Sequence, residues 1–470
     1  MAYTTIDNPE LYHQNKIYSG NNSSQSITFD GSENMRPDWL WIKCRTHADS
    51  SQIVDSVRGT GALRSDATNA EADISGNGFT SYDSDGFTLN GSNGGGNINN
   101  SGRNYVAFAW SAGGASPAIT YTVKVVSDSG NKYRFDDFGT SAVTLDLQEG
   151  GTYTFDQSDS SNSGHPLRFS TTSNGTHGGG SEYTTGVTTT GTPGSSGAKT
   201  VITVAASAPT LYYQCSSHSG MGGQANTNST FGSSNFSGSI QSTVSAGITQ
   251  GMSIVSWEGT GSAATIGHSL SAVPTMIMVK NRDQADSWYV YNVANGNTHS
   301  IILDTNSAKV GAYTDNWNNT TPTSSVFSVG GSHATSGGSG EKMIAYVFTD
   351  IQGYSKVSGT YSGNGNADGT FCWCGFAPSF VMVKKTSEAR EWMIWDNKRD
   401  TFNPAKTVLH PDGTSAEDAS TSYEMIDILS NGFKLRQSDT DTNQSGGTYI
   451  FMAFAEAPFV NSKGVPNNAR

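Results

Sequence analysis

The chain has 470 residues, of which 55 are glycine, and only 14% of its residues are charged, with a formal net charge of −13. This length allows three or four domains, each with its own core. The acidic residues are scattered and no basic stripe is present to neutralise phosphates, so nucleic acid is excluded as a partner. No apolar run is long enough to cross a membrane.

Short runs of Val, Ile, Tyr, Phe and Trp, bounded by Gly, Asn, Asp and Ser, recur from one end of the chain to the other. Such runs are typical of β-strands separated by turns, and long helical windows are absent. An all-β fold is therefore predicted. The hydrophobic content of 34% favours thin modules with long polar loops, or subunits that are completed by oligomerisation.

Residues 1–19 are polar with scattered aromatic side chains, which predicts an extended arm that docks to a partner. They lack the basic and apolar segments of a secretory signal, so the protein is expected to be made in a cytosol. The cysteines are not spaced as a disulfide framework. They are Cys44, Cys215, Cys372 and Cys374.

After this arm, one pattern of four apolar segments occurs three times in the same order. An opening strand is led by proline, a second strand follows a polar gap, a third is built around phenylalanine, and an aromatic strand closes the unit. The segments are 37–43, 53–58, 85–89 and 105–110; 274–280, 288–292, 325–329 and 343–348; and 378–384, 392–396, 431–435 and 449–454. This repetition indicates one supersecondary unit present in three copies.

Alternation within these segments places one apolar face inward, as in a two-sheet antiparallel sandwich. The closing segments are apolar on both faces, which predicts a central position in the sheet. The predicted modules cover residues 20–117, residues 231–352 including a linker, and residues 353–470 including a C-terminal tail. The repeat also predicts equivalent positions for Trp39, Met276 and Phe380, and for Phe108, Tyr346 and Met452.

Residues 118–230, between the first two modules, have a different pattern of short strand-like runs separated by turn residues. The last run ends at Cys215, which is followed by His218 and Met221, and a Gly-His-Pro segment upstream contains His165. A thiolate, two imidazoles and a weak thioether are the ligands of a trigonal copper site with a long axial bond. Zinc prefers tetrahedral nitrogen and sulfur ligands, fits three of the four residues, and is the alternative metal.

No other group of residues has the pattern of a catalytic site, and an enzyme is not predicted. Glycine-rich stretches lack the lysine of a phosphate loop. Neighbouring acidic pairs lie in turn-rich segments, where aspartate caps loops. His177, in a glycine-rich segment, is predicted to be a polar loop residue rather than a ligand.

The repeats resemble those of tail-fibre-like virion proteins of marine phages. The residues that carry the resemblance are the Pro-x-x-Val-x-Val-Lys opening, the segment 353–365 and the ending 449–459. The resemblance implies jelly-roll, concanavalin A/laminin G-like sandwiches in a phage virion structural protein, a tail fibre or tail appendage subunit involved in host attachment. A capsid-decorating or head-fibre protein is the alternative within the same biology.

The inserted segment resembles the cupredoxin family, the relatives of plastocyanin and azurin, through its Gly-His-Pro segment and its Cys-x-x-His-x-x-Met string. The resemblance implies a β-barrel in which His165, Cys215, His218 and Met221 bind copper for electron transfer. Met221 follows His218 by three positions, which is closer than in plastocyanin itself. A copper redox protein with lectin-like targeting domains is a further alternative.

These interpretations together predict a homo-trimer in the virion, assembled in the host cytoplasm. Its expected partners are other virion proteins and a host surface receptor or glycan, with no nucleic acid and no membrane insertion. The trimer is expected because thin, glycine-rich modules leave sheet edges and apolar surface that symmetry mates can cover.

Overall fold

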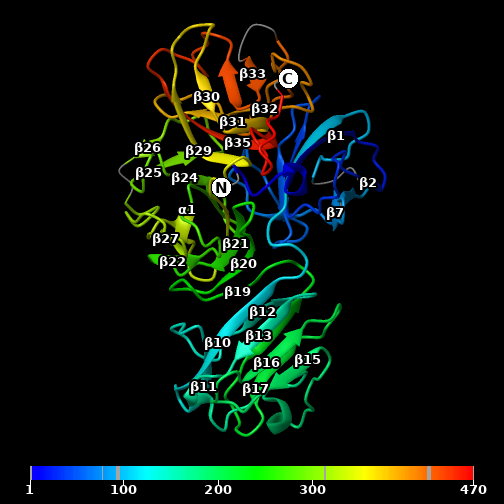
Figure 1. Cartoon of the computed structure of the whole chain (residues 1–470), viewed down its shortest axis with the longest axis vertical. Helices are drawn as coiled ribbons and strands as arrows, with labels where there is room; N and C mark the ends of the chain where they lie inside the picture. The colour runs from blue at the N-terminus through cyan, green and yellow to red at the C-terminus, as the bar shows by residue number, and fades with distance from the viewer. Residues whose placement is uncertain (1–2, 77, 92–95, 312–313, 421–424, 469–470) are drawn as a thin grey trace. The chain divides into compact units, whose positions relative to one another are not determined.

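β-Strands make up nearly all the regular structure of the chain, so the predicted all-β class is confirmed (Figure 1). The structure is a computed structural model that describes residues 3–468 except 77, 92–95, 312–313 and 421–424. In this described part the α-helical structure is limited to α1 (His333–Ser336), and no helix there has the length and hydropathy of a membrane span. Residues 1–2 of the predicted arm and 469–470 of the predicted tail lie outside the described residues.

The chain divides into two units. Unit 1 comprises Met1–Ala112, Ala246–Ala264 and Ser269–Arg470, and unit 2 comprises Gly113–Ser245 and Thr265–His268. Unit 1 therefore contains the three predicted repeats together, and unit 2 contains the inserted segment.

Each repeat of unit 1 builds a large antiparallel sheet in which a lead-in strand, the closing strand, the opening strand and the second strand lie in that order. The closing strand is central each time, as predicted from its two apolar faces. In this order the strands are β1 (His13–Ser19), β9 (Asn104–Trp110), β3 (Trp39–Cys44) and β4 (Gln52–Asp55) in module 1; β21 (Met252–Glu258), β28 (Lys342–Phe348), β23 (Met276–Asn281) and β24 (Tyr289–Asn292) in module 2; and β29 (Ser355–Ser362), β35 (Thr448–Pro458), β31 (Phe376–Lys385) and β32 (Met393–Asp396) in module 3.

The phenylalanine-centred strands lie apart from these large sheets. In module 1 the small sheet has the order β2 (Gln25–Ile27), β8 (Gly86–Leu89), β7 (Phe79–Asp83), and in module 3 the order β30 (Phe371–Trp373), β34 (Gly432–Leu435), β33 (Ile426–Leu429). The corresponding strand of module 2 is β27 (Val326–Val329). The large sheets are extended by β5 (Gly61–Leu63) and β6 (Ala72–Asp73) in module 1, and by β25 (His299–Ile302) and β26 (Val310–Gly311) in module 2.

Strand register shows that the three modules are equivalent residue by residue. Equivalent residues of the three opening strands lie opposite equivalent residues of the closing strands: Trp39 opposite Trp110, Met276 opposite Phe348 and Phe380 opposite Phe454. Two residues further on, Trp41, Met278 and Met382 lie opposite Phe108, Tyr346 and Met452. Both sets of predicted equivalences are therefore present in the sheets.

The predicted docking arm is wrong for the described residues before 20. His13–Ser19 form β1, which pairs with β9 along its whole length and supplies the lead-in strand of module 1. Upstream of it, the Tyr3 hydroxyl donates to the Gly375 carbonyl at 2.9 Å, and the Thr4 hydroxyl donates to the Gln352 carbonyl at 2.7 Å. The segment is polar because β1 is an edge strand whose later side chains alternate with solvent, so its sequence lacks a strong apolar pattern.

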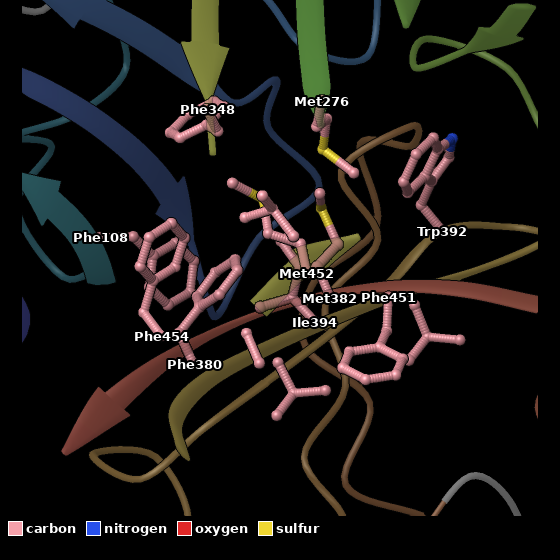
Figure 2. Packing of buried hydrophobic residues seen from close by; sticks show 14 of the residues in the cluster. Phe108, Met276, Phe348, Phe380, Met382, Trp392, Ile394, Phe451, Met452 and Phe454 are labelled. Carbon is pink, nitrogen blue, oxygen red and sulfur yellow. The ribbon is translucent and has the colours of Figure 1, made fainter. Parts of the chain in front are cut away.

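The large sheets of all three modules share one hydrophobic core. In β3, Leu40 and Ile42 belong to the separate core between the two sheets of module 1, whereas Trp39 and Trp41 belong to the shared core. Figure 2 shows part of that core, where Phe108 of module 1 lies beside Phe380 and Phe454 of module 3; the centroids of the Phe108 and Phe380 rings are 5.0 Å apart. Both faces of these sheets are thus buried within one chain.

Aromatic contacts join every pair of modules in this core. The Trp39 and Tyr346 rings of modules 1 and 2 have centroids 4.7 Å apart, and the Phe348 and Phe454 rings of modules 2 and 3 have centroids 6.2 Å apart. The apolar surface that was expected to require a partner chain is therefore covered by neighbouring modules. A homo-trimer remains a prediction, but the need to cover apolar module surface no longer supports it.

A buried lysine at the end of each opening strand joins its module to another module. Lys43, Lys280 and Lys384 occupy equivalent positions and are 2%, 0% and 0% exposed. Their ammonium groups donate to the carbonyls of Gly413, Thr68 and Asn306, at 2.6, 3.1 and 3.0 Å. These bonds run from module 1 to module 3, from module 2 to module 1 and from module 3 to module 2, so they close a cycle.

Backbone hydrogen bonds join the same three pairs of modules, but the donor and acceptor modules are exchanged. The amides of Glu417, Glu71 and Lys309 donate to the carbonyls of Arg45, Arg282 and Thr386, at 2.9, 2.7 and 3.1 Å. The three modules consequently form one approximately threefold structure within a single chain, rather than three independent domains.

Unit 2 is a two-sheet sandwich, and the predicted closed β-barrel is not found among its described residues. One sheet has the order β11 (Asn131–Phe135), β10 (Ala118–Ser127), β13 (Thr152–Asp156), β16 (Lys199–Thr203), β15 (Val187–Thr190), and the other the order β12 (Leu145–Gln148), β18 (Gln224–Asn228), β17 (Leu211–Cys215), β14 (Leu167–Ser170). The pairs β10–β13 and β12–β18 are parallel. The two sheets pack around a core rich in tyrosine and phenylalanine instead of closing on each other.

Unit 2 also extends beyond the predicted limit of residue 230. The Phe236 ring packs in its core with its centroid 5.5 Å from that of Tyr121, whose hydroxyl donates to the Ser234 carbonyl at 2.8 Å. The segment predicted to be a linker therefore belongs in part to this unit. Its further elements are β19 (Ser233–Asn235) and parts of β20 (Ser242–Gly247) and β22 (Ala264–Gly267), whose other residues belong to unit 1.

Candidate metal centre

Pairing of two strands in unit 2 brings the predicted metal ligands together. β14 and β17 are antiparallel, with Leu167 opposite Cys215. His165 lies two residues before Leu167, and His218 lies in the turn that follows Cys215. The register therefore places both histidines at the same end of this strand pair as the cysteine.

The three side chains converge on one point. The Cys215 Sγ atom is 3.8 Å from the Nδ1 atom of His165 and 3.6 Å from the Nδ1 atom of His218. All the potential ligand atoms lie within 4.8 Å of one another. Metal bonds of about 2.3 Å to sulfur and about 2.0 Å to nitrogen separate these atoms by about 3.5–3.7 Å at tetrahedral to trigonal angles, so both sulfur–nitrogen distances are close to those of a metal site.

Burial is graded across the site. Cys215 is fully buried, His165 is half-buried and His218 is exposed. Burial, assisted by the nearby His218, lowers the pKa of His165. A lowered pKa keeps the imidazole neutral near pH 7, which is the form that binds a metal.

Met221 lies in the same loop, as predicted, and is only 1% exposed within the core of unit 2. Its carbonyl accepts a hydrogen bond from the Tyr133 amide at 2.9 Å. The chain can turn back into β18 directly after Met221 because Gly222 touches the neighbouring strand. A Cβ atom at Gly222 would lie 1.7 Å from the Tyr213 carbonyl oxygen, so only glycine fits there.

His177 is in η3 (Gly175–Gly178) and is exposed, as expected for a loop residue. Its Nε2 atom is 3.2 Å from the Cys215 carbonyl oxygen. Because a carbonyl only accepts hydrogen bonds, Nε2 is the donor here and is directed at the backbone of Cys215. His177 therefore supports the ligand loop from outside, a role that its glycine-rich surroundings do not indicate.

Two further residues hold the site, and neither is evident in the sequence. The Tyr133 hydroxyl of β11 donates to the His165 carbonyl at 2.8 Å, and burial, together with the adjacent Cys215, raises the pKa of Tyr133. Asn174 binds the ligand loop twice: its amide nitrogen donates to the Ser219 hydroxyl and its amide oxygen accepts from the Gly220 amide, both at 2.8 Å. These contacts join segments far apart in the chain, so no local pattern could reveal them.

Within the described residues, this is the one cluster of three or more His, Cys, Asp or Glu side chains with a geometry suited to a metal ion. The other three cysteines, Cys44, Cys372 and Cys374, are buried free thiols. Burial raises the pKa of each of them, which disfavours the thiolate form that binds metals. Of the four cysteines, Cys215 is the one that lies in such a cluster within the described residues.

A comparison with family models gives one match, to the family described as domain of unknown function (DUF7483), over residues 8–142 and 224–458. No curated protein matches the chain significantly. The matched residues cover more than half of the chain, and the gap between them contains all four predicted metal ligands. The chain belongs to the family of domain of unknown function DUF7483.

Proposed function

We propose that unit 2 is a cupredoxin-like copper-binding domain in which His165, Cys215 and His218 bind the ion and Met221 supplies a weak axial ligand. The observation that carries this proposal is the spacing of the Cys215 Sγ atom from two imidazole nitrogens, 3.8 and 3.6 Å. One thiolate with two imidazoles and a thioether is the set that copper prefers, whereas structural zinc sites use four strong ligands. Bound copper would supply one-electron redox chemistry.

The residues of the chain determine how such an ion is held. Cys215 is shielded from solvent, so its thiolate is protected from oxidation, while exposed His218 forms the edge of the site. Tyr133, Asn174 and His177 bind the backbone of the ligand segments and keep the nitrogen and sulfur atoms in place. A site held in this way before the metal arrives loses little conformational entropy on binding.

Copper binding is testable with the full chain. Titration of the reduced protein with Cu²⁺ is expected to saturate at one ion per chain and to produce an intense visible band from thiolate-to-copper charge transfer. Cys215→Ser is expected to abolish the band and to weaken copper binding at least about 10-fold, since even the loss of outer partners costs that much. The control Cys44→Ser removes another buried thiol and should leave the band unchanged. Equal affinity in Cys215→Ser and the unaltered protein would refute the site.

We propose that the chain as a whole is a structural protein of a phage virion, a tail fibre or tail appendage subunit, and not an enzyme. The resemblance of the repeats supports this role, as does the burial of both faces of the large sheets in a shared core, which makes unit 1 a rigid support. Its proposed partners are other virion proteins and a host surface receptor or glycan. Capsid decoration or head-fibre attachment is the alternative placement, and a copper redox protein with targeting modules is the alternative class.

Location in the particle separates these roles. Gold-labelled antibodies against the full chain are expected to mark the tail of purified phage particles in electron micrographs. Label spread over the head would instead favour a capsid-decorating protein. Particles that contain no such chain, by mass spectrometry of the purified virion, would rule out a structural role and leave the copper redox protein.

A further inference from the structure

Unit 1 contains a cavity of 370 Å³ at the junction of modules 1 and 3. Its walls come from η1 (Pro9–Leu11) and β1 of module 1, and from β31, β35 and the loop after β32 of module 3. This volume falls in the range of about 300–1,000 Å³ that is usual for small-molecule sites. The cavity forms where β1, which the sequence predicted to be part of an extended arm, packs against module 3.

His13 of β1 lines this cavity and presents a hydrogen-bond acceptor to be satisfied. Its Nδ1 atom is 2.9 Å from the Ala109 carbonyl, which only accepts, so Nδ1 carries the proton. The ring is 2% exposed and packs between Trp110 and Phe454, with centroids 4.7 and 5.2 Å away. Its Nε2 atom is therefore an unprotonated acceptor, and it is buried with no partner among the described residues.

Asn15 presents a second acceptor of the same kind. Its amide nitrogen donates to the Ser379 carbonyl at 2.9 Å, which determines the orientation of the amide group. The Oδ1 atom on the other side is buried and has no partner in the described part of the chain, and Asn15 is 2% exposed. Unsatisfied buried polar atoms are rare in native proteins because each costs free energy. Two of them, two residues apart on the same face of one strand that lines a cavity, point to a ligand that donates hydrogen bonds.

We propose that this cavity binds a polyhydroxylated ligand of the size of one sugar residue, whose hydroxyl groups donate to His13 and Asn15. Both acceptors are neutral, so a hydroxyl donor satisfies them without the desolvation cost of burying an ammonium group. The carboxylates of Glu10 and Glu456 at the cavity provide more acceptors, and Lys398 provides a donor for a ring or hydroxyl oxygen. The cavity lies in unit 1 and the metal centre in unit 2, so a failure of either proposal leaves the other unaffected. The sugar-binding proposal also does not depend on a role in the virion.

Ligand-observed NMR with the full chain tests this proposal, using D-glucose, D-galactose and D-glucosamine as probes at millimolar concentration. At least one of the neutral sugars is expected to bind. Asn15→Leu removes one acceptor and should weaken that binding at least about 10-fold, as for a site built to bind a hydroxyl. Thr401→Trp fills the cavity from the exposed Thr401 without altering the core, and should abolish binding even if Asn15→Leu proves unstable. Asn131→Leu, an exposed position in unit 2, is the matched control and should bind normally.

The outcomes separate cleanly. Loss of binding in Thr401→Trp, with normal binding in the control, supports the cavity as the site. If Thr401→Trp and Asn15→Leu both bind the sugar as tightly as the unaltered protein, the sugar binds elsewhere and the proposal is overturned. Binding of glucosamine alone would show that an ammonium group is recognised, which overturns the choice of a hydroxyl ligand. No binding of any probe would mean that water alone satisfies His13 and Asn15, and the proposal fails.

Discussion

Replacement of Lys280 by methionine is expected to lower the free energy of unfolding of unit 1 by at least about 3 kcal/mol. Lys280 is 0% exposed, and its ammonium group donates to the carbonyls of Thr68, Asn281 and Gln284 at 3.1, 2.7 and 3.2 Å. Burial lowers its pKa to about 8, so the group is still protonated at pH 7 and uses all three donors. Methionine keeps the apolar stem but leaves three carbonyls without this donor.

Urea denaturation at pH 7 measures this effect, followed by tryptophan fluorescence. The matched control is Lys342→Met on β28, the neighbouring strand, where the lysine is exposed and the change should cost less than about 0.5 kcal/mol. Because the three modules share one core, Lys384→Met should destabilise the same cooperative transition rather than module 3 alone. Separate transitions for separate modules, or equal stability of Lys280→Met and Lys342→Met, would contradict the cyclic arrangement.

Acid is expected to destabilise unit 1 through His13 by as much as about 5 kcal/mol. Burial lowers the pKa of His13 from 6.5 to about 3, because the ring is enclosed by Trp110 and Phe454. The folded state therefore binds fewer protons than the unfolded state between these two pH values. The stabilisation from the neutral ring is complete above pH 6.5 and is lost progressively as the pH falls toward 3.

The comparison of unfolding free energies at pH 7, 6, 5 and 4 isolates this residue. The chain should lose stability steadily over this range, whereas His13→Gln, which cannot be protonated, should show a shallower dependence on pH. His47→Gln, at an exposed histidine, is the control and should keep the slope of the unaltered protein. If His13→Gln and the unaltered protein have the same slope, other groups cause the acid sensitivity.

The sequence by itself determined the features that depend on residues close together in the chain. Twelve repeat segments were located within a few residues of the strands, because each consists of apolar residues bounded by turn residues. Cys215 and His218 were also recognised as candidate metal ligands, because they are only three residues apart and such spacing is visible in the sequence. His165 lies in a second short motif, and strand pairing between β14 and β17 brings it close to Cys215.

Only the tertiary structure decided the role of β1, the shared core and the supports of the metal centre. The first three residues of β1, His13, Gln14 and Asn15, are all buried although all are polar, and their sequence therefore reads as solvent-exposed. They are buried because β1 pairs with the apolar strand β9 and is covered by module 3, and neither contact is encoded near them. Likewise, the sequence indicated that the modules have apolar surface that another module or chain must cover. Only the structure shows that other modules of the same chain cover it. Long-range strand pairing determines which segments are buried, because backbone hydrogen bonds and shared burial outweigh the local preference of a polar segment for water.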